Sequence, residues 1–149
     1  MKRSPISRKS PKRKKEDKLY EALCRKVDRS HTDKADNVIC FFCEQAICDV
    51  DEQDVKWKVD HHHLLKRDEH FLTERYLVPA HPKCHMQDYH VVEDTDAMFD
   101  RPWFGKFLYH IRDGEPAKYN EYIRKYEARK GKNPTYRGKA LSLVEAKRE

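Results

Sequence analysis

The chain has 149 residues, of which 39% are charged and 38% hydrophobic, and its net charge is +6. This composition predicts one domain with a modest core, in which about 90 to 120 residues fold. We expect neither a transmembrane helix nor a secretory signal, because the sequence lacks a long apolar run and its basic N-terminus lacks an apolar segment. A reducing compartment, cytoplasmic or nuclear, is therefore expected, where five cysteines favour metal ligation over disulfides.

The positive charge is concentrated at the N-terminus. Residues 1–18 carry nine Lys or Arg and two acidic residues, a net +7, so the other 131 residues sum to −1. Prolines, serines and basic runs predict a disordered arm over this segment. The arm, with Lys12, Arg13, Lys14 and Lys15 at its centre, predicts binding to a polyanion, with nucleic acid the first candidate and membrane the last. A solubilising tail is the alternative.

Apolar periodicity outlines the elements that follow the arm. In chain order they are a helix (18–29), a loop (30–37), a strand (55–59), a loop (66–75), a strand (76–79), a short helix (82–90) and two helices separated by Gly114. The expected units are the arm (1–18), a helix and loop (19–37), a metal-bound core (38–92), a helical extension (93–130) and a polar basic tail (131–149).

Two pairs of metal-binding residues lie far apart in the chain. Cys40 and Cys43 have the two-residue gap that lets two thiolates reach one tetrahedral ion, and His81 and Cys84 repeat this gap. Two such pairs are typical of a structural zinc that joins segments with little core of their own. We therefore predict a zinc site at these four residues, with Cys48 as an alternative to His81.

A second group of polar residues lies between and beside these pairs. Asp60 and His61 follow the predicted strand, and His85 directly follows Cys84. Phosphodiester hydrolysis needs a divalent ion to neutralise the phosphate and a base with a pKa near 7 to deprotonate water. This group predicts that Asp60 and His85 hold the ion and that His61 acts as the base.

The run of three histidines makes this assignment depend on the backbone. Alternate residues of an extended strand face the same side, so His61 and His63 would face away from Asp60 and His62. A site that uses both Asp60 and His61 therefore requires a bend in the strand. His90 follows His85 by five residues, about 140° round an α-helix, which predicts that these two histidines do not share an ion.

Together these motifs resemble the zinc-containing HNH, or ββα-metal, nucleases, most closely the recombination endonuclease VII and NinG/Rap groups of phage proteins. The resemblance covers residues 38–92. It is carried by Cys40-x2-Cys43, Val59-Asp60-His61, Leu77-Val78-Pro79-Ala80 and x2-Cys84-His85. It implies an α+β fold, in which a small zinc-stapled ββα-metal (His-Me finger) core with flanking helices holds one Mg²⁺ or Mn²⁺.

The chain departs from the family pattern at three positions. His81 stands where the family usually has a zinc-binding cysteine, and His85 stands where many zinc-bearing members have asparagine. Tyr76 replaces the asparagine that normally braces the hairpin loop. A colicin-like register, with successive histidines at 61 and 62, is the alternative assignment of the base.

The resemblance implies a metal-dependent DNA endonuclease of phage type that acts in recombination, repair or packaging. Its partner would be DNA, branched or nicked, and its compartment the host cytoplasm; a homodimer is compatible with the sequence. The alternative is a non-catalytic, zinc-stabilised nucleic-acid-binding module, and a structural accessory protein is a third candidate. Asp60-His61 is the feature that a binding module would not need.

Overall fold

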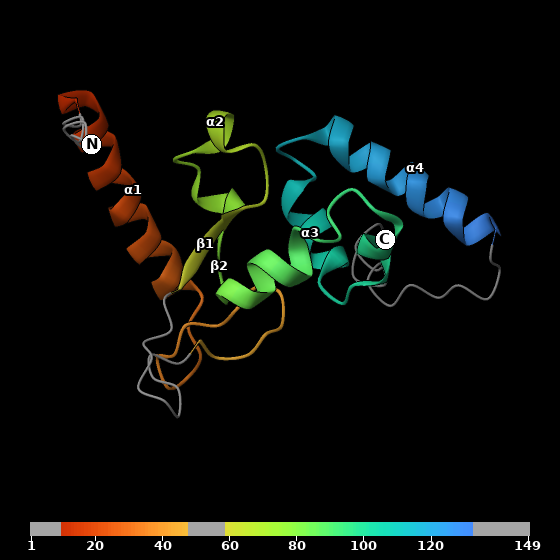
Figure 1. Ribbon diagram of the computed structural model, residues 1–149, viewed down its shortest axis with the longest axis horizontal. Helices are drawn as coiled ribbons and strands as arrows, with labels where there is room; N and C mark the ends of the chain where they lie inside the picture. The colour runs from red at the N-terminus through yellow and green to blue at the C-terminus, as the bar shows by residue number, and fades with distance from the viewer. Residues whose placement is uncertain (1–9, 48–58, 133–149) are drawn as a thin grey trace, which may run out of the picture.

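The computed structural model describes residues 10–47 and 59–132, with side chains up to residue 129 in the last helix. Helices surround a two-stranded antiparallel sheet (Figure 1). Residues 1–9, most of the predicted strand over 55–59, Cys48 and the tail from 133 onward lie outside the described residues. No helix in the described ranges is long and apolar enough to cross a membrane.

Helix α1 (Pro11–Ser30) begins seven residues before the predicted start. Ser10 caps it by accepting a hydrogen bond from the backbone N–H of Arg13 at 3.3 Å, and Pro11 occupies the first helical position. The prediction of disorder is therefore wrong for residues 11–18. The basic residues of this first part of α1 are exposed, and α1 leads away from the sheet toward its N-terminal end (Figure 1).

The sheet is a short hairpin formed by β1 (Asp60–His63) and β2 (Leu77–Ala80). The pairing is regular from Asp60 opposite Ala80 to His63 opposite Leu77. The connection predicted as a loop contains the one-turn helix α2 (Arg67–His70) and the 3-10 turn η1 (Glu74–Tyr76). Every residue of β2 is buried, so the hairpin is held from both sides.

The remaining elements form the helical part of the core. The π-helical turn η2 (Cys84–Tyr89) lies within the short helix predicted over 82–90, and the 3-10 turn η3 (Asp96–Asp100) follows. The two predicted helices are confirmed as α3 (Phe104–Ile111) and α4 (Pro116–Lys132).

Aromatic rings fill the space between the helices and the hairpin. The Phe42 and Trp103 rings meet edge to face at 5.3 Å, and Tyr89 lies 5.5 Å from both. The Trp103 indole N–H donates to Asp88 Oδ2 at 3.0 Å, so its polar atom is satisfied as the ring is buried. This packing attaches η2 to α3 and thereby fixes the helix that follows the second ligand pair.

Tyr76 packs at the junction between the hairpin and the turn that separates α3 from α4. It is buried, and its ring meets His70 edge to face at 4.9 Å. A Cβ atom added at Gly114 would overlap with the hydroxyl oxygen and Cζ of Tyr76. The Tyr76 ring therefore fits only because Gly114 has no side chain. Tyr76 occupies the position at which the HNH nucleases that this sequence resembles have asparagine.

Gly114→Ala is expected to lower the free energy of unfolding by about 1–3 kcal/mol, because the added methyl group overpacks this contact. Tyr76→Leu in the same chain should relieve the overlap, so the double variant should lose less stability than the sum of the two single variants. Chemical denaturation of the four proteins measures this coupling. Additive losses would contradict the proposed contact.

Candidate metal centres

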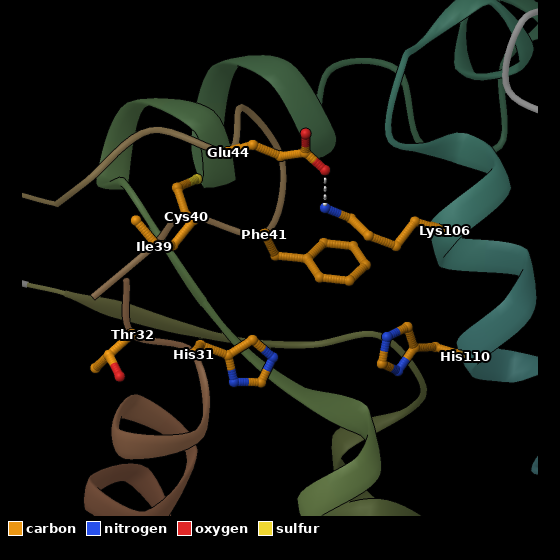
Figure 2. Close-up of a pocket in the computed structure, with 8 residues that line it drawn as sticks. All are labelled: His31, Thr32, Ile39, Cys40, Phe41, Glu44, Lys106 and His110. Carbon is orange, nitrogen blue, oxygen red and sulfur yellow. Dashed lines mark hydrogen bonds and ion pairs between the residues drawn. The ribbon is translucent and has the colours of Figure 1, made fainter. Parts of the chain in front are cut away.

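The first ligand pair lies in a tight hairpin-like loop between α1 and the segment not described. Cys40 N–H donates to the Gln45 carbonyl at 2.9 Å, and Glu44 adopts a left-handed conformation with φ of 60° that closes the turn. In Figure 2 the Cys40 sulfur and the Phe41 ring point away from each other. Phe41 N–H donates to the Pro79 carbonyl at 2.9 Å, which places this loop alongside β2.

Because β2 leads directly to the second ligand pair, the two pairs meet. The ligand atoms of Cys40, Cys43, His81 and Cys84 all lie within 4.8 Å of one another. His81 Nδ1 is 3.3 Å from Cys43 Sγ and 3.9 Å from Cys84 Sγ. Sulfur and nitrogen ligands of one tetrahedral zinc ion are separated by about 3.5 Å, which follows from the usual bond lengths. The predicted clustering is confirmed, and the donor set suits a structural metal such as zinc.

The tautomer of His81 supports the same conclusion. Its Nε2–H donates to the Ala46 carbonyl at 3.2 Å, which leaves the lone pair of Nδ1 directed at the thiols. Burial, followed by the neighbouring Cys40 and Cys43 thiols, raises the pKa of Cys84. A cation at the centre of the four ligands would stabilise the thiolates that this surrounding otherwise disfavours.

A second cluster consists of three histidines from the hairpin and the turn that follows it. His62 comes from β1, whereas His85 and His90 come from η2 and the residue after it. Their ligand nitrogens all lie within 4.8 Å of one another, and the Nε2 atoms of His85 and His90 are 3.0 Å apart. Three imidazoles that converge in this way form a candidate site for a transition-metal ion.

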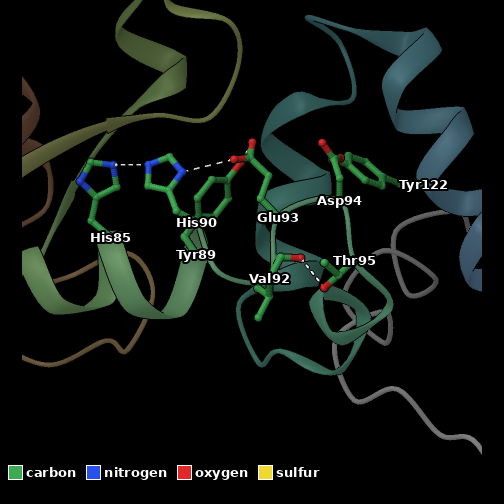
Figure 3. Close-up of polar contacts among 8 residues, drawn as sticks. All are labelled: His85, Tyr89, His90, Val92, Glu93, Asp94, Thr95 and Tyr122. Carbon is green, nitrogen blue, oxygen red and sulfur yellow. Dashed lines mark hydrogen bonds and ion pairs between the residues drawn. The ribbon is translucent and has the colours of Figure 1, made fainter.

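The prediction that the side chains of His85 and His90 are too far apart round the helix to share an ion easily is wrong. It assumed α-helical spacing, but η2 has π-helical hydrogen bonds, and His90 N–H donates to the His85 carbonyl at 3.2 Å. The wider turn brings residues five positions apart onto one face of the helix. The side chains of His85 and His90 therefore lie side by side (Figure 3).

Carboxylates set the tautomers of two of the three imidazoles. The Nδ1 atom of His85 lies 3.2 Å from Asp60 Oδ2. Figure 3 shows the contact of His90 with Glu93, in which Nδ1 lies 3.3 Å from Oε2. When each Nδ1–H donates to its carboxylate, each Nε2 presents a lone pair toward the other. The Tyr89 hydroxyl donates to Glu93 Oε1 at 3.0 Å and holds that carboxylate in place. Two facing lone pairs 3.0 Å apart favour a shared cation between them.

His62 completes the cluster from the interior. It is 5% exposed, and its Nε2 atom is buried without a hydrogen-bond partner in the described part of the chain. Burial, with the neighbouring His85 and His90 adding to it, lowers the pKa of His62 to about 2. Its imidazole is therefore neutral, as a metal ligand must be, and its unpaired buried nitrogen is a feature that a bound ion could satisfy.

The predicted catalytic residues are divided between the two faces of β1. Asp60 and His85 are brought together as predicted, on the face that carries His62. His61 faces α1 instead, where its Nε2 lies 2.7 Å from Asp28 Oδ1. Because the pairing is regular over all four residues, β1 lacks the bend that we expected at this site.

Sequence analysis did not select His90 or Glu93 for the site. The signal was present as a histidine five residues after His85 and a glutamate three residues after His90. The five-residue spacing places His85 and His90 on one face only in a π-helix, so the sequence alone does not assign His90, or its partner Glu93, to the site. Asp28, the partner of His61, lies too far away in the chain to be found by spacing.

Comparison of the chain with models of protein families, with curated proteins and with solved structures gave no match. The functional assignment therefore depends on the geometry of the two clusters.

The four-residue cluster is expected to hold one zinc ion per chain. Cys84→Ser should abolish zinc binding and lower the free energy of unfolding by several kcal/mol, because structural zinc contributes directly to folding. Cys24→Ser, at a free cysteine on α1, is the matched control and should keep both zinc and stability. Elemental analysis and thermal unfolding measure the two quantities; a zinc-free, fully stable parent protein would contradict the prediction.

Proposed function

We propose that the protein is a metal-dependent endonuclease of the HNH, or ββα-metal, class that hydrolyses phosphodiester bonds in DNA. A β-hairpin followed by a short helix, next to a Cys/His cluster, has the arrangement that this class would need. The observation that carries the proposal is the three-histidine cluster, in which a buried histidine with an unpartnered Nε2, His62, lies beside His85 and His90. A binding module has no use for such a group.

The ligand atoms of this cluster favour some divalent ions over others. Imidazole nitrogens suit Mn²⁺, Ni²⁺ or Zn²⁺, whereas Mg²⁺ prefers oxygen ligands. Of the two ions implied by the resemblance, Mn²⁺ therefore fits this cluster and Mg²⁺ does not. A divalent ion held by His62, His85 and His90 would neutralise charge on the scissile phosphate. Asp60 and Glu93 orient the imidazoles from behind.

His61 is the proposed base. Asp28 accepts the Nε2–H of His61, so Nδ1 keeps the lone pair that accepts a proton, and the carboxylate stabilises the resulting imidazolium. His61 and the three-histidine cluster lie on opposite faces of β1. The proposal therefore requires a substrate that contacts both faces of the strand.

Helix α1 supplies the proposed contact with the DNA backbone. It carries eight Lys or Arg and four acidic residues, and its first turns are exposed to solvent. Cationic side chains on a protruding helix bind phosphates without regard to sequence. The C-terminal part of α1 carries Asp28, so the same helix connects the phosphate-binding surface to His61.

The test is nicking of supercoiled plasmid by the zinc-loaded protein with Mn²⁺, Ni²⁺ or Mg²⁺ added. Mn²⁺ should support cleavage better than Mg²⁺. His90→Ala, at an exposed residue, should lose both cleavage and binding of the added ion. His61→Ala should lower the rate by about 10² to 10⁴ while the ion still binds.

Gln87→Ala is the matched control, because Gln87 is exposed on the same turn η2 and belongs to none of the groups of metal-binding residues. It should cleave like the parent protein. Parental activity in His61→Ala, together with loss of activity in His62→Ala, would place the acting histidine at position 62. A parent protein that binds DNA but does not nick it with any of the ions would favour the non-catalytic module. The contact of His61 with Asp28, on the face of β1 away from the three-histidine cluster, supports that alternative.

Replacing Lys12, Arg13, Lys14 and Lys15 with glutamine is expected to weaken DNA binding and its salt dependence. Loss of four phosphate contacts would make the slope of log affinity against log salt less steep by up to about 3.6. Fluorescence anisotropy with a short duplex at several salt concentrations measures this slope. Arg124→Gln/Lys125→Gln on α4 is the control; an equal effect there would show that α1 has no special role.

A further inference from the structure

A cavity of about 320 Å³ lies between the Cys40 loop and α3 (Figure 2). It is separate from the three-histidine cluster, and none of its functional groups has a part in the proposed cleavage. The side chains that matter for its chemistry are His31, Thr32, Phe41, Glu44, Lys106 and His110. Its volume lies in the range of small-ligand sites.

The two histidines of the cavity present hydrogen-bond acceptors. His31 Nδ1–H donates to the Val27 carbonyl at 2.9 Å, and His110 Nδ1–H donates to the Arg75 carbonyl at 3.3 Å. Each Nε2 therefore carries a lone pair, and neither has a hydrogen-bond partner among the described residues. Figure 2 shows the two imidazole rings facing each other across the cavity. Burial lowers the pKa of His110, which keeps its ring neutral.

The other polar groups reinforce this acceptor character. The Thr32 hydroxyl donates to the Arg29 carbonyl at 3.3 Å, so its oxygen is left to accept. Lys106 Nζ lies 2.9 Å from Glu44 Oε1 and 4.5 Å from the centre of the Phe41 ring. Since the carboxylate offsets the ammonium charge, the cavity is a poor site for an anion. It suits a flat, neutral ligand with N–H donors on one edge and an acceptor near Lys106.

We propose that the cavity binds a nucleobase with an amino group beside a ring-nitrogen acceptor, as adenine, cytosine and guanine have, from the nucleic acid that the protein acts on. The exocyclic amino group would donate to the Nε2 atoms of His31 and His110, and the base would lie beside Lys106, which covers the face of the Phe41 ring. The ring nitrogen beside the amino group would accept from Lys106. Uracil and thymine place carbonyl oxygens where the amino group would lie, opposite the histidine lone pairs.

The cavity lies where a bound base could position the nucleic-acid strand. Phe41 is hydrogen-bonded to Pro79 of β2, so the cavity is attached to the hairpin that carries His62. His31 lies one helical turn beyond Asp28, the partner of His61. A base held here would set the position of its strand relative to the three-histidine cluster. The source of the base rests on the proposed function, but its recognition by the cavity does not.

The test uses free nucleosides and the full, zinc-loaded chain. Adenosine and cytidine should shift the NMR signals of the His31, His110 and Phe41 rings, with affinities at least about tenfold above that of uridine, because uridine leaves the acceptors unpaired. Equal affinity for uridine, no binding of adenosine, or stronger binding of inorganic phosphate would each overturn the proposal.

His110→Phe keeps a ring in place but removes the acceptor, and it should reduce the preference for adenosine over uridine by about tenfold. Lys106→Met, at a partly exposed side chain, should weaken adenosine binding even if His110→Phe does not fold. His70→Phe, outside the cavity, is the control and should leave both affinities unchanged. An inactive protein that still selects adenosine would refute only the nuclease proposal, whereas an active nuclease without this selectivity would refute only the base-binding site.

Discussion

The meeting of Cys40, Cys43, His81 and Cys84 is the constraint on which the rest of the structure depends. It joins the loop after α1 to the end of β2, two short segments that also meet in the apolar core. Because η2 starts at Cys84, the cluster also determines where the following histidines emerge. Its loop forms one wall of the cavity through Phe41. A metal ion here would therefore stabilise both candidate sites at once.

The polar residues of β1 are divided between the two faces of the strand. Successive side chains of an extended strand point in opposite directions, so Asp60 and His62 face η2 while His61 and His63 face α1. His63 stacks on Tyr20 of α1 at 5.7 Å. One short run of four residues thus contributes a candidate metal ligand to one side and a candidate base to the other. The hairpin is the element that a substrate would have to approach from both faces.

Hydrogen bonds to Nδ1 or Nε2 decide what each imidazole can do. Asp60 and Glu93 direct the lone pairs of their histidines into the three-histidine cluster, and the Ala46 carbonyl does the same for His81 in the four-residue cluster. In the cavity, backbone carbonyls of α1 and η1 leave His31 and His110 as acceptors. The same side chain can therefore serve as a metal ligand, a base or an acceptor in one small protein.

Local patterns in the chain were sufficient for the Cys40–Cys43 and His81–Cys84 pairs, for α3 and α4 and for the break at Gly114, since each depends on short-range spacing. The start of α1 was also encoded locally, by Ser10 and Pro11, although the basic run obscured it. Two features depended on tertiary contacts. The π-helical turn that unites His85 with His90 and the pairing of β1 that turns His62 inward and His61 outward are both set by packing against β2, Phe42 and Trp103. Spacing along a chain cannot reveal which of several hydrogen-bonding patterns a short segment adopts, because the free energy that selects the pattern comes from residues far away in sequence.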